Sequence, residues 1–542
     1  MTDITAPMSA AAGASEHHGK PKLDQPVNPL AGIIFMGVIG AALLFVAYSL
    51  YSDVDATGTK VTTLVPYILL FVALLIALGF EFVNGFHDTA NAVATVIYTH
   101  SLPANVAVVW SGCFNLLGVL VSSGAVAFGI IALLPVELIL QVGSDAGFAM
   151  VFALLIAAII WNVGTWYFGL PSSSSHTLIG SIIGVGLMNQ LMAIPGTGTS
   201  GVDWSQALGI GKSLLLSPLV GFVAAALLLL AAKALIKRPE LYRAPEGNKP
   251  PPLWIRGLLV LTCTGVSFAH GSNDGQKGMG LIMLILIGTV PTAYALNRAM
   301  PEAQITAFEQ SSQQAAGVLA HYAGTTAAPA DARAAVTAYV RDRTLAPETV
   351  PALVALTQEI DRSVAGRSSL AAVPNEQVGN IRNDMYLASE ALKQMAKANS
   401  PAFSADDGKV LTAYRGYLDQ ATKFIPDWVK VAVAIALGLG TMVGWKRIVV
   451  TVGEKIGKEH LTYAQGGSAE LVAMATIGAA DMYGLPVSTT HVLSSGVAGT
   501  MAANRSGLQW STIRNLIMAW VLTLPVSIAL AAALYWLLRH LF

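Results

Sequence analysis

The residues with the clearest chemical potential are two short runs of hydroxyl side chains that each follow a proline. The first run is Ser173 to Ser175 within "GLPSSSSHTLIG", and the second is Ser488 to Thr490 within "GLPVSTTHVLSS". A proline suits the first turn of a helix, where backbone N–H groups are unpaired and the helix dipole is positive. Hydroxyls and free N–H groups at two such helix starts could together bind an anion.

Two acidic residues form a second candidate pair. Asp88 lies within "NGFHDTANA", and Asp274 lies within the similar segment "HGSNDGQKG". An ionised side chain inside a membrane is costly, and its presence there is a functional-site hypothesis by default. Because a carboxylate repels an anion, the two acids fit an anion site only if a cation or a proton is shared.

The elements that carry these residues are predicted to be membrane helices. The chain has 542 residues, of which 54% are hydrophobic and 11% are charged, whereas soluble domains carry about 25% charged residues. A helix needs about 20 apolar residues to cross a bilayer core. The segments predicted to cross are 30–51, 65–86, 104–133, 148–168, 213–236, 256–294, 428–444, 466–484 and 514–541.

The two hydroxyl runs lie in shorter apolar segments, at 172–190 and 487–503. Both segments are interrupted by Pro, Ser and Gly, a pattern typical of discontinuous half-helices that line a site within the membrane. Cys113 and Cys263 lie in apolar spans and predict neither a disulfide nor a metal site. The formal net charge is zero, so the composition gives no indication of a nucleic-acid partner.

An internal repeat relates the two sets of motifs. The hydroxyl runs share a preceding Gly-Leu-Pro and a following His, and the aspartate motifs also correspond. Asp88 precedes Ser173 by 85 positions, whereas Asp274 precedes Ser488 by 214. The excess is close to the length of residues 295–426, which are polar and place apolar residues at helical spacing. We therefore expect a duplicated unit with a soluble helical insert in its second copy.

The placement of Lys and Arg predicts the orientation. The basic segments 237–256 and 445–460 are expected inside, and the loop at 132–147, which has no Lys or Arg, is expected outside. Segment 256–294 then begins inside, whereas the matching segment 65–99 begins outside. The copies are therefore inverted, as is typical of secondary transporters with a site near the bilayer midplane. The N-terminus is expected in the cytoplasm, and the C-terminus and the insert outside.

The predicted fold is an all-α integral membrane protein with two inverted-topology repeats, discontinuous half-helices at the midplane and a soluble helical insert. Its predicted parts are a disordered tail at 1–29, an extra transmembrane helix at 30–51, a first repeat at 62–236, a basic cytoplasmic linker at 237–256, a second repeat at 257–294 and 427–542, and the insert at 295–426.

The four motifs, together with "WNVGTWYFGLP" and "TVGEKIG", resemble the signatures of the inorganic phosphate transporter (PiT) family, most closely its bacterial low-affinity branch. The resemblance covers about residues 62–541. It implies a transporter of the bacterial inner membrane, and not an enzyme, that imports phosphate by cation symport through alternating access. In the bacterial branch it implies proton coupling and a neutral metal phosphate, such as the magnesium complex. In other relatives it implies sodium coupling. His87 replaces the Asn of many relatives.

Roles within the site follow from these two lines of reasoning. The expected phosphate ligands are Ser173, Ser174, Ser175, Ser488, Thr489, Thr490, Asn91 and Asn273. The residues expected to handle the cation or proton are Asp88, Asp274, Asn84, Glu81 and His87, with His176, His270 and His491 as further candidates. Lys277 is expected either to neutralise Asp274 or to contact phosphate. No catalytic residue, resident metal or cofactor is expected. The expected partners are phosphate, a proton or sodium ion, the lipid bilayer and a second copy in a homodimer.

Two other classes of protein are alternatives to a transporter. An intramembrane hydrolase would use the Ser and His residues, or a metal at His87 and Asp88. Enzymes rarely duplicate a Ser–His element in both halves, and a metal site needs further ligands at close spacing. An oxyanion channel would need a continuous polar stripe, whereas polar residues here cluster at two broken helices, as alternating access requires.

Overall fold

The computed structural model describes residues 21, 23, 28–58, 65–88, 90–193, 201–247 and 249–541, and every regular element in them is a helix. The predicted disordered tail at 1–29 lies almost entirely outside the described residues. The helices of the first half of the chain are α1 (Pro29–Asp55), α2 (Val65–Asp88), α3 (Ala90–Tyr98), α4 (Ala104–Val121), α5 (Ala125–Ile131), α6 (Val136–Leu140), α7 (Asp145–Tyr167), α8 (Ser174–Leu191), α9 (Trp204–Leu235) and the short η1 (Pro239–Tyr242).

The second half of the chain continues the bundle and adds a group of helices outside it. Its helices are α10 (Leu253–Thr289), α11 (Pro291–Tyr294), α12 (Glu302–Ala323), α13 (Ala332–Asp342), α14 (Thr349–Val364), η2 (Leu370–Ala372), α15 (Asn375–Ala398), α16 (Ala405–Thr422), α17 (Asp427–Thr441), α18 (Lys446–Val450), η3 (Thr451–Lys455), α19 (Tyr463–Met482), α20 (Thr489–Asn504) and α21 (Trp510–Leu541).

Seven segments of the described chain are long and apolar enough to cross a membrane. They are Pro29–Asp55, Tyr67–Tyr98, Ala104–Val121, Asp145–Tyr167, Trp204–Leu235, Leu253–Thr289 and Trp510–Leu541. The chain is therefore a multi-pass membrane protein, as predicted. The prediction of one span at 104–133 is wrong, because α4 ends at Val121 and α5 begins after Gly124, whose φ of 85° breaks the helix.

The two hydroxyl runs each begin a helix in the interior of the bundle. The chain turns between α7 and α8 at Gly169 and between α19 and α20 at Gly484, with φ of 66° and 64°. This left-handed conformation favours glycine. The Ser173 side chain accepts from His176 N at 3.2 Å and caps α8, and the Ser488 side chain accepts from His491 N at 3.1 Å and caps α20. Cap geometry therefore fixes both helix starts at the predicted motifs.

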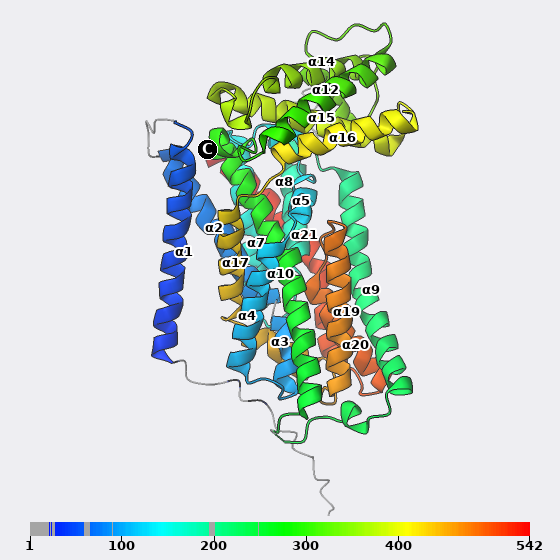
Figure 1. The fold of residues 1–542 in the computed structure, drawn as a ribbon. Helices are drawn as coiled ribbons and strands as arrows, with labels where there is room; N and C mark the ends of the chain where they lie inside the picture. Colours follow the sequence, from blue (N-terminus) through cyan, green and yellow to red (C-terminus); the bar gives the residue numbers. More distant parts are fainter. Residues whose placement is uncertain are drawn as a thin grey trace, which may run out of the picture.

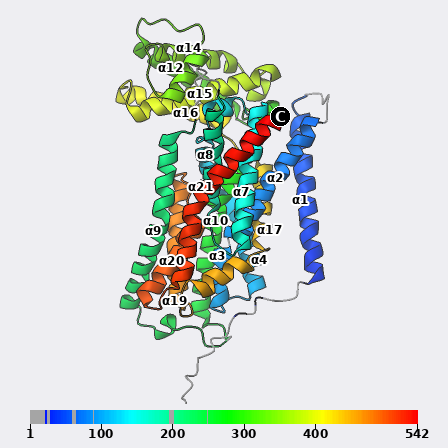
Figure 2. The ribbon, with the colours of Figure 1, turned by 180° about the vertical axis from the view of Figure 1, so that it is seen from behind.

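Helices from the two halves of the chain pack against one another in matched pairs. Helix α2 packs on α17 and α10 packs on α4, while α8 packs on α21 and α9 packs on α20. Figure 2 shows α21 crossing the back of the bundle beside α8 and α7. The approach is close at both aspartate motifs: a Cβ at Gly85 would lie 2.3 Å from Leu437 O, and a Cβ at Gly271 would lie 2.1 Å from Asn115 O.

Helices α12 to α16 form a separate layer at one end of the bundle, the end at which the C-terminus also lies (Figure 1). Apolar residues of these helices, such as Phe308, Leu353 and Tyr414, are buried among one another. The layer is joined to the bundle by polar contacts. Asn383 of α15 donates to Leu140 O at 3.1 Å, and Arg343 beyond α13 pairs with Asp203 at the start of α9.

Candidate functional site

The starts of α8 and α20 converge with the end of α2 and the middle of α10 in the interior of the bundle. The predicted residues at this point are buried: Glu81, Asn84, His87, Asp88, Asn91, Ser173, Ser174, Ser175, Asn273, Asp274, Ser488, Thr489 and Thr490. Their segments are far apart in sequence, and both halves of the chain contribute to the cluster.

Asp88 is held by hydroxyl and imidazole groups. Its Oδ2 accepts from Ser174 Oγ at 2.6 Å, and its Oδ1 accepts from Thr490 Oγ1 at 2.9 Å. His87 Nδ1 lies 2.8 Å from the same Oδ1. The two hydroxyls come from the starts of α8 and α20, so this carboxylate connects both half-helices.

Ser174 also links the two acids. Its Oγ lies 2.6 Å from Asp88 Oδ2 and 3.4 Å from Asp274 Oδ2. Its backbone N lies 3.4 Å from Asp88 Oδ2. The acids from the two aspartate motifs therefore lie at one site, as the repeat predicted.

Lys277 provides the cation of the second motif. Its Nζ lies 2.7 Å from Asp274 Oδ2 and 2.5 Å from Ser175 Oγ. Both side chains of the ion pair are fully buried. Of the two alternatives for Lys277, the structure has it neutralising Asp274, through an i,i+3 contact on α10. The position that corresponds to Lys277 in the first motif is Asn91, which is uncharged.

Asp88, His270 and Asp274 are grouped closely enough to hold a metal ion. One ligand atom from each lies within 4.8 Å of the others. Two carboxylates and an imidazole form a mixed oxygen and nitrogen set that suits several divalent ions. His270 Nδ1 lies 2.9 Å from Asn115 Oδ1, which orients the ring toward Asp274. The sequence predicted no metal site. It did not bring these three residues together, because Asp88 is distant from His270 and Asp274 in the sequence.

Several buried polar atoms around the acids have no hydrogen-bond partner within the described chain. They are Thr489 Oγ1, Asn273 Oδ1, Asp274 Oδ1 and Asn84 Oδ1. Leaving such groups unsatisfied is costly. These atoms could bind a polar ligand at this point.

The chain shares its family with characterised proteins. A model described as "Phosphate transporter family" matches residues 84–531. The chain is 44% identical over 490 residues to the low-affinity inorganic phosphate transporter PitA of Escherichia coli (strain K12), an alignment that covers 87% of this chain and 96% of that protein. The chain belongs to the phosphate transporter family. This confirms the family predicted from the motifs, and a transporter rather than an enzyme.

A second curated relative and one solved structure are also similar to the chain. The chain is 42% identical over 498 residues to the low-affinity inorganic phosphate transporter PitB of Escherichia coli (strain K12), covering 88% of this chain and 97% of that protein. A solved structure titled "The sodium-dependent phosphate transporter" has 17% sequence identity and a TM-score of 0.48, and the match covers 88% of this chain and 100% of that one. This likeness is too distant to carry an argument about the chain.

Other residues predicted for the transporter's site have contacts of different kinds. Asn91 Nδ2 donates to Asp88 O at 2.8 Å and to Thr490 Oγ1 at 3.2 Å, so it supports the acid. Asn273 Nδ2 donates to Leu485 O at 3.1 Å, in the turn before α20. Glu81 accepts from Asn84 Nδ2 at 3.3 Å and lies about two helical turns before Asp88.

The two histidines that follow the hydroxyl runs stack on each other. The ring centroids of His176 and His491 are 4.6 Å apart, and His491 also lies 4.3 Å from the ring of Trp520. His176 Nδ1 and His491 Nε2 have no hydrogen-bond partner in the described residues.

Glu470 is a buried acid that the sequence reasoning missed. It lies on α19 and accepts hydrogen bonds from the hydroxyls of Thr95 on α3 and Thr262 on α10. An acid within the predicted span at 466–484 was the available signal. Its distance from the aspartate motifs in the sequence concealed its position in the bundle.

Proposed function

We propose that the protein imports inorganic phosphate by symport with a cation, most simply a proton, and that the site between α8 and α20 alternates between the two sides of the membrane. The proposal combines the family with the geometry of the two buried acids. The observation that carries it is the unequal neutralisation of Asp88 and Asp274.

Asp274 has a built-in counter-ion and Asp88 does not. Lys277 Nζ lies 2.7 Å from Asp274, whereas the hydroxyls of Ser174 and Thr490 that reach Asp88 carry no charge. An anion that enters beside an ionised Asp88 meets repulsion in a region of low dielectric. Binding of a proton at the His87–Asp88 pair, or of a metal cation between the two acids, would remove that repulsion. Entry of the anion would therefore be coupled to entry of the cation.

Phosphate suits the neutral groups of the site. A tetrahedral oxyanion must exchange its hydration shell for hydrogen-bond donors when it enters a bilayer. Thr489 Oγ1, at the start of α20, has no partner in the described residues. The other donors at the two helix starts, whose dipole ends are positive, would exchange their present protein acceptors for phosphate: the hydroxyls of Ser174, Ser175 and Thr490 and the amides of Asn91 and Asn273. Ser173 and Ser488 would contribute through the caps that hold those starts. A metal phosphate, with its metal near Asp88, His270 and Asp274, would enter with little net charge.

Alternating access is supported by the paired packing of the two halves. In the proposed inverted repeats, α2 with α3 corresponds to α10, α4 to α17, α7 to α19, α8 to α20 and α9 to α21. The contact of α2 with α17 is then equivalent to that of α10 with α4. In the same way, the contact of α9 with α20 is equivalent to that of α21 with α8. Two equivalent arrangements of such halves would expose the site to opposite sides.

The proposed location is the bacterial inner membrane, with the N-terminus in the cytoplasm. Helices α12 to α16 and the C-terminus lie at the same end of the bundle (Figure 1). This agrees with the expectation that both are periplasmic. The layer of residues 295–426 is proposed to be a soluble insert in the second repeat.

Uptake of radiolabelled phosphate into proteoliposomes tests the proposal. Proton and sodium gradients are imposed separately, each with and without magnesium. We expect accumulation above the equilibrium level under an inward proton gradient and a further increase with magnesium. Accumulation only with a sodium gradient would identify sodium, and not the proton, as the coupling ion. Equilibration without accumulation under either gradient would refute symport.

A further inference from the structure

Arg382 is a buried cation at the seam between the layer of α12 to α16 and the bundle. It lies on α15 and is 6% exposed. Its Nη1 donates to Ile139 O on α6 at 3.3 Å and to Asn383 Oδ1 at 3.1 Å, and its guanidinium lies 5.3 Å from the ring centroid of Tyr386. The mechanism proposed for phosphate does not use this side chain.

No acidic side chain pairs with Arg382 in the described part of the chain. Its Nε is buried without a hydrogen-bond partner. Glu390, two turns further along α15, is instead paired with Lys393 at 3.1 Å and with Lys423 at 3.4 Å. Burial lowers the pKa of the Arg382 guanidinium. An arginine stays protonated even so, and its charge is left uncompensated.

A small cavity of about 30 Å³ lies beside the guanidinium. It is lined by Arg382, Tyr386, Glu390, Thr422 and Lys423 from the insert and by apolar side chains of α5 and α10, among them Phe128, Met283 and Ile287. Lys423 is also paired with Asp419 at 2.8 Å, so Arg382 is the lining cation that has no acidic partner in the described residues. One water molecule needs roughly 10–15 Å³ of such volume, so a cavity of about 30 Å³ is small and suits a monatomic ion better than a tetrahedral one.

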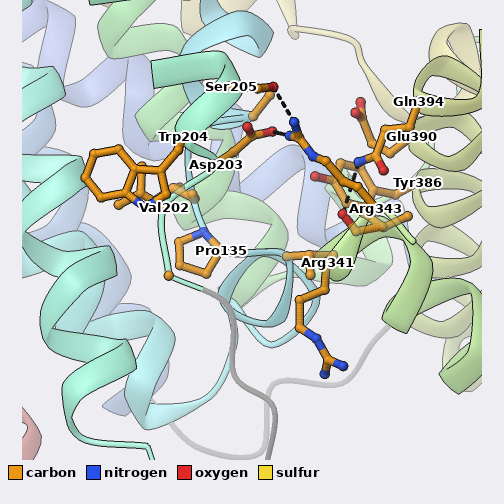
Figure 3. A pocket seen from close by; sticks show the side chains of 15 residues that line it. Pro135, Val202, Asp203, Trp204, Ser205, Arg341, Arg343, Tyr386, Glu390 and Gln394 are labelled. Atoms are coloured by element: carbon orange, nitrogen blue, oxygen red, sulfur yellow. Dashed lines mark hydrogen bonds and ion pairs between the residues drawn. The ribbon is translucent and has the colours of Figure 1, made fainter. Parts of the chain in front are cut away.

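A larger cavity lies beside this space. It measures about 250 Å³ and shares Ala132, Tyr386 and Glu390 with the smaller one. Figure 3 shows Tyr386, Glu390 and Gln394 on one side of it and Asp203, Trp204 and Ser205 on the other, with Arg343 bridging to Asp203 and Ser205. The small cavity therefore lies next to a larger one with a polar lining.

We infer that Arg382 forms a binding site for a monatomic anion such as chloride, which joins the insert to the bundle. The anion would lie in the small cavity between Arg382 and Lys423 and would supply the charge that Arg382 lacks. This site is separate from the phosphate site, and it does not depend on the proposed function.

A structural role for Arg382 is the competing explanation. Helix α6 ends at Leu140, and a cation near a helix C-terminus is favourable because the carbonyl end carries partial negative charge. In that case the Ile139 carbonyl would satisfy the charge alone. Arg382 would then contribute to stability without any dependence on the anion in solution.

Thermal unfolding of the purified full-length protein separates the two explanations. Gluconate is replaced by chloride at constant ionic strength, and the wild type is compared with Arg382→Gln. Arg333→Gln is the matched control, because Arg333 lies in the same insert but is paired with Asp384 at 2.6 Å. We expect chloride to raise the unfolding midpoint saturably by about 2 °C in the wild type and in Arg333→Gln, and not in Arg382→Gln. An equal chloride response in Arg382→Gln would overturn the inference.

A second measurement does not depend on the folding of a variant. Wild-type crystals soaked in bromide should give an anomalous peak between Arg382 and Lys423, and the absence of a peak there would overturn the site. Sulfate in place of chloride should give no saturable rise. A rise as large as that with chloride would overturn the assignment to a monatomic anion.

Discussion

Lys277 Nζ lies 2.7 Å from Asp274 Oδ2, in an ion pair whose two side chains are fully buried. The corresponding acid of the first motif, Asp88, has Asn91 three residues later instead of a lysine. Two motifs that are similar in sequence thus differ in charge. In the proposed mechanism, Asp88 is therefore the acid that meets a cation from solution.

The buried pair predicts a specific pattern of stability. Asp274→Asn or Lys277→Met alone leaves one charge buried without a partner, which costs about 3–5 kcal/mol. We expect both single variants to lose most of the monodisperse protein in gel filtration. The double variant Asp274→Asn/Lys277→Met removes both charges and should recover folded protein.

Asp88→Asn is the matched control for this pattern. The amide oxygen that replaces a carboxylate oxygen still accepts from Ser174 or Thr490, and no lysine loses its partner. The variant should elute as the wild type does. A Lys277→Met variant as stable as the wild type would contradict the predicted cost of leaving Asp274 without its partner.

Neighbouring serines should separate binding from capping. Ser174→Ala removes the hydroxyl that reaches both acids. A hydrogen bond to a charged group contributes about 1.5–3 kcal/mol, so we expect roughly a 10- to 100-fold loss in kcat/KM for phosphate uptake. Ser173→Ala removes the α8 cap and should lower the free energy of unfolding by about 1 kcal/mol, with a smaller effect on uptake. Equal effects of the two substitutions on uptake would contradict these roles.

His87 should control the response of uptake to pH. Its Nδ1 lies 2.8 Å from Asp88 Oδ1 and its Nε2 lies 3.1 Å from Thr165 Oγ1. The Thr165 hydroxyl can donate to the ring or to Trp161 O, so the ring can gain a proton without moving. His87→Asn removes the imidazole beside Asp88 and should flatten the dependence of uptake on external pH. His321→Asn, in the insert, should leave the profile unchanged. A wild-type profile for His87→Asn would exclude the residue from coupling.

The glycines of the aspartate motifs should tolerate no side chain. A Cβ at Gly85 or Gly271 would lie 2.3 or 2.1 Å from a backbone carbonyl oxygen of a neighbouring helix. Backbone cannot move aside cheaply, so Gly85→Ala and Gly271→Ala should each destabilise the protein by about 1–3 kcal/mol or more. Gly79→Ala, six residues before Gly85 on α2, meets nothing within 4 Å and is the control. The midpoints of thermal unfolding of the three variants test this prediction. Similar midpoints would contradict close packing at the motifs.

Much of the fold could be predicted because its signals are local. Apolar length predicted the seven spans of the described chain, although the predicted spans 428–444 and 466–484 are not among them. The Gly-Leu-Pro-hydroxyl pattern predicted helix starts that the structure has at Ser174 and Thr489. The break after α4 was missed because only Ser122, Ser123 and Gly124 interrupt a long apolar stretch. The backbone leaves the helix there, with ψ of 148° at Ser122 and φ of 85° at Gly124. Composition predicts which segments are buried, but it does not predict the backbone dihedral angles that a single residue adopts.

The contacts of the site were harder to predict because they join distant segments. The i,i+3 spacing gave Lys277 a partner in Asp274, yet its contact with Ser175 depends on how α8 packs on α10. His270 joined the acids for the same reason. Arg382 carried no local signal, because only the docking of α15 on α6 buries it.

Gradient-driven phosphate uptake by Asp88→Asn in proteoliposomes tests the central claim most directly. Asp88 is proposed to be the acid whose charge the entering cation neutralises. We therefore expect the folded variant to lose accumulation above equilibrium under an inward proton gradient, with and without magnesium. Accumulation equal to that of the wild type would show that cation coupling does not depend on Asp88 and would contradict the account.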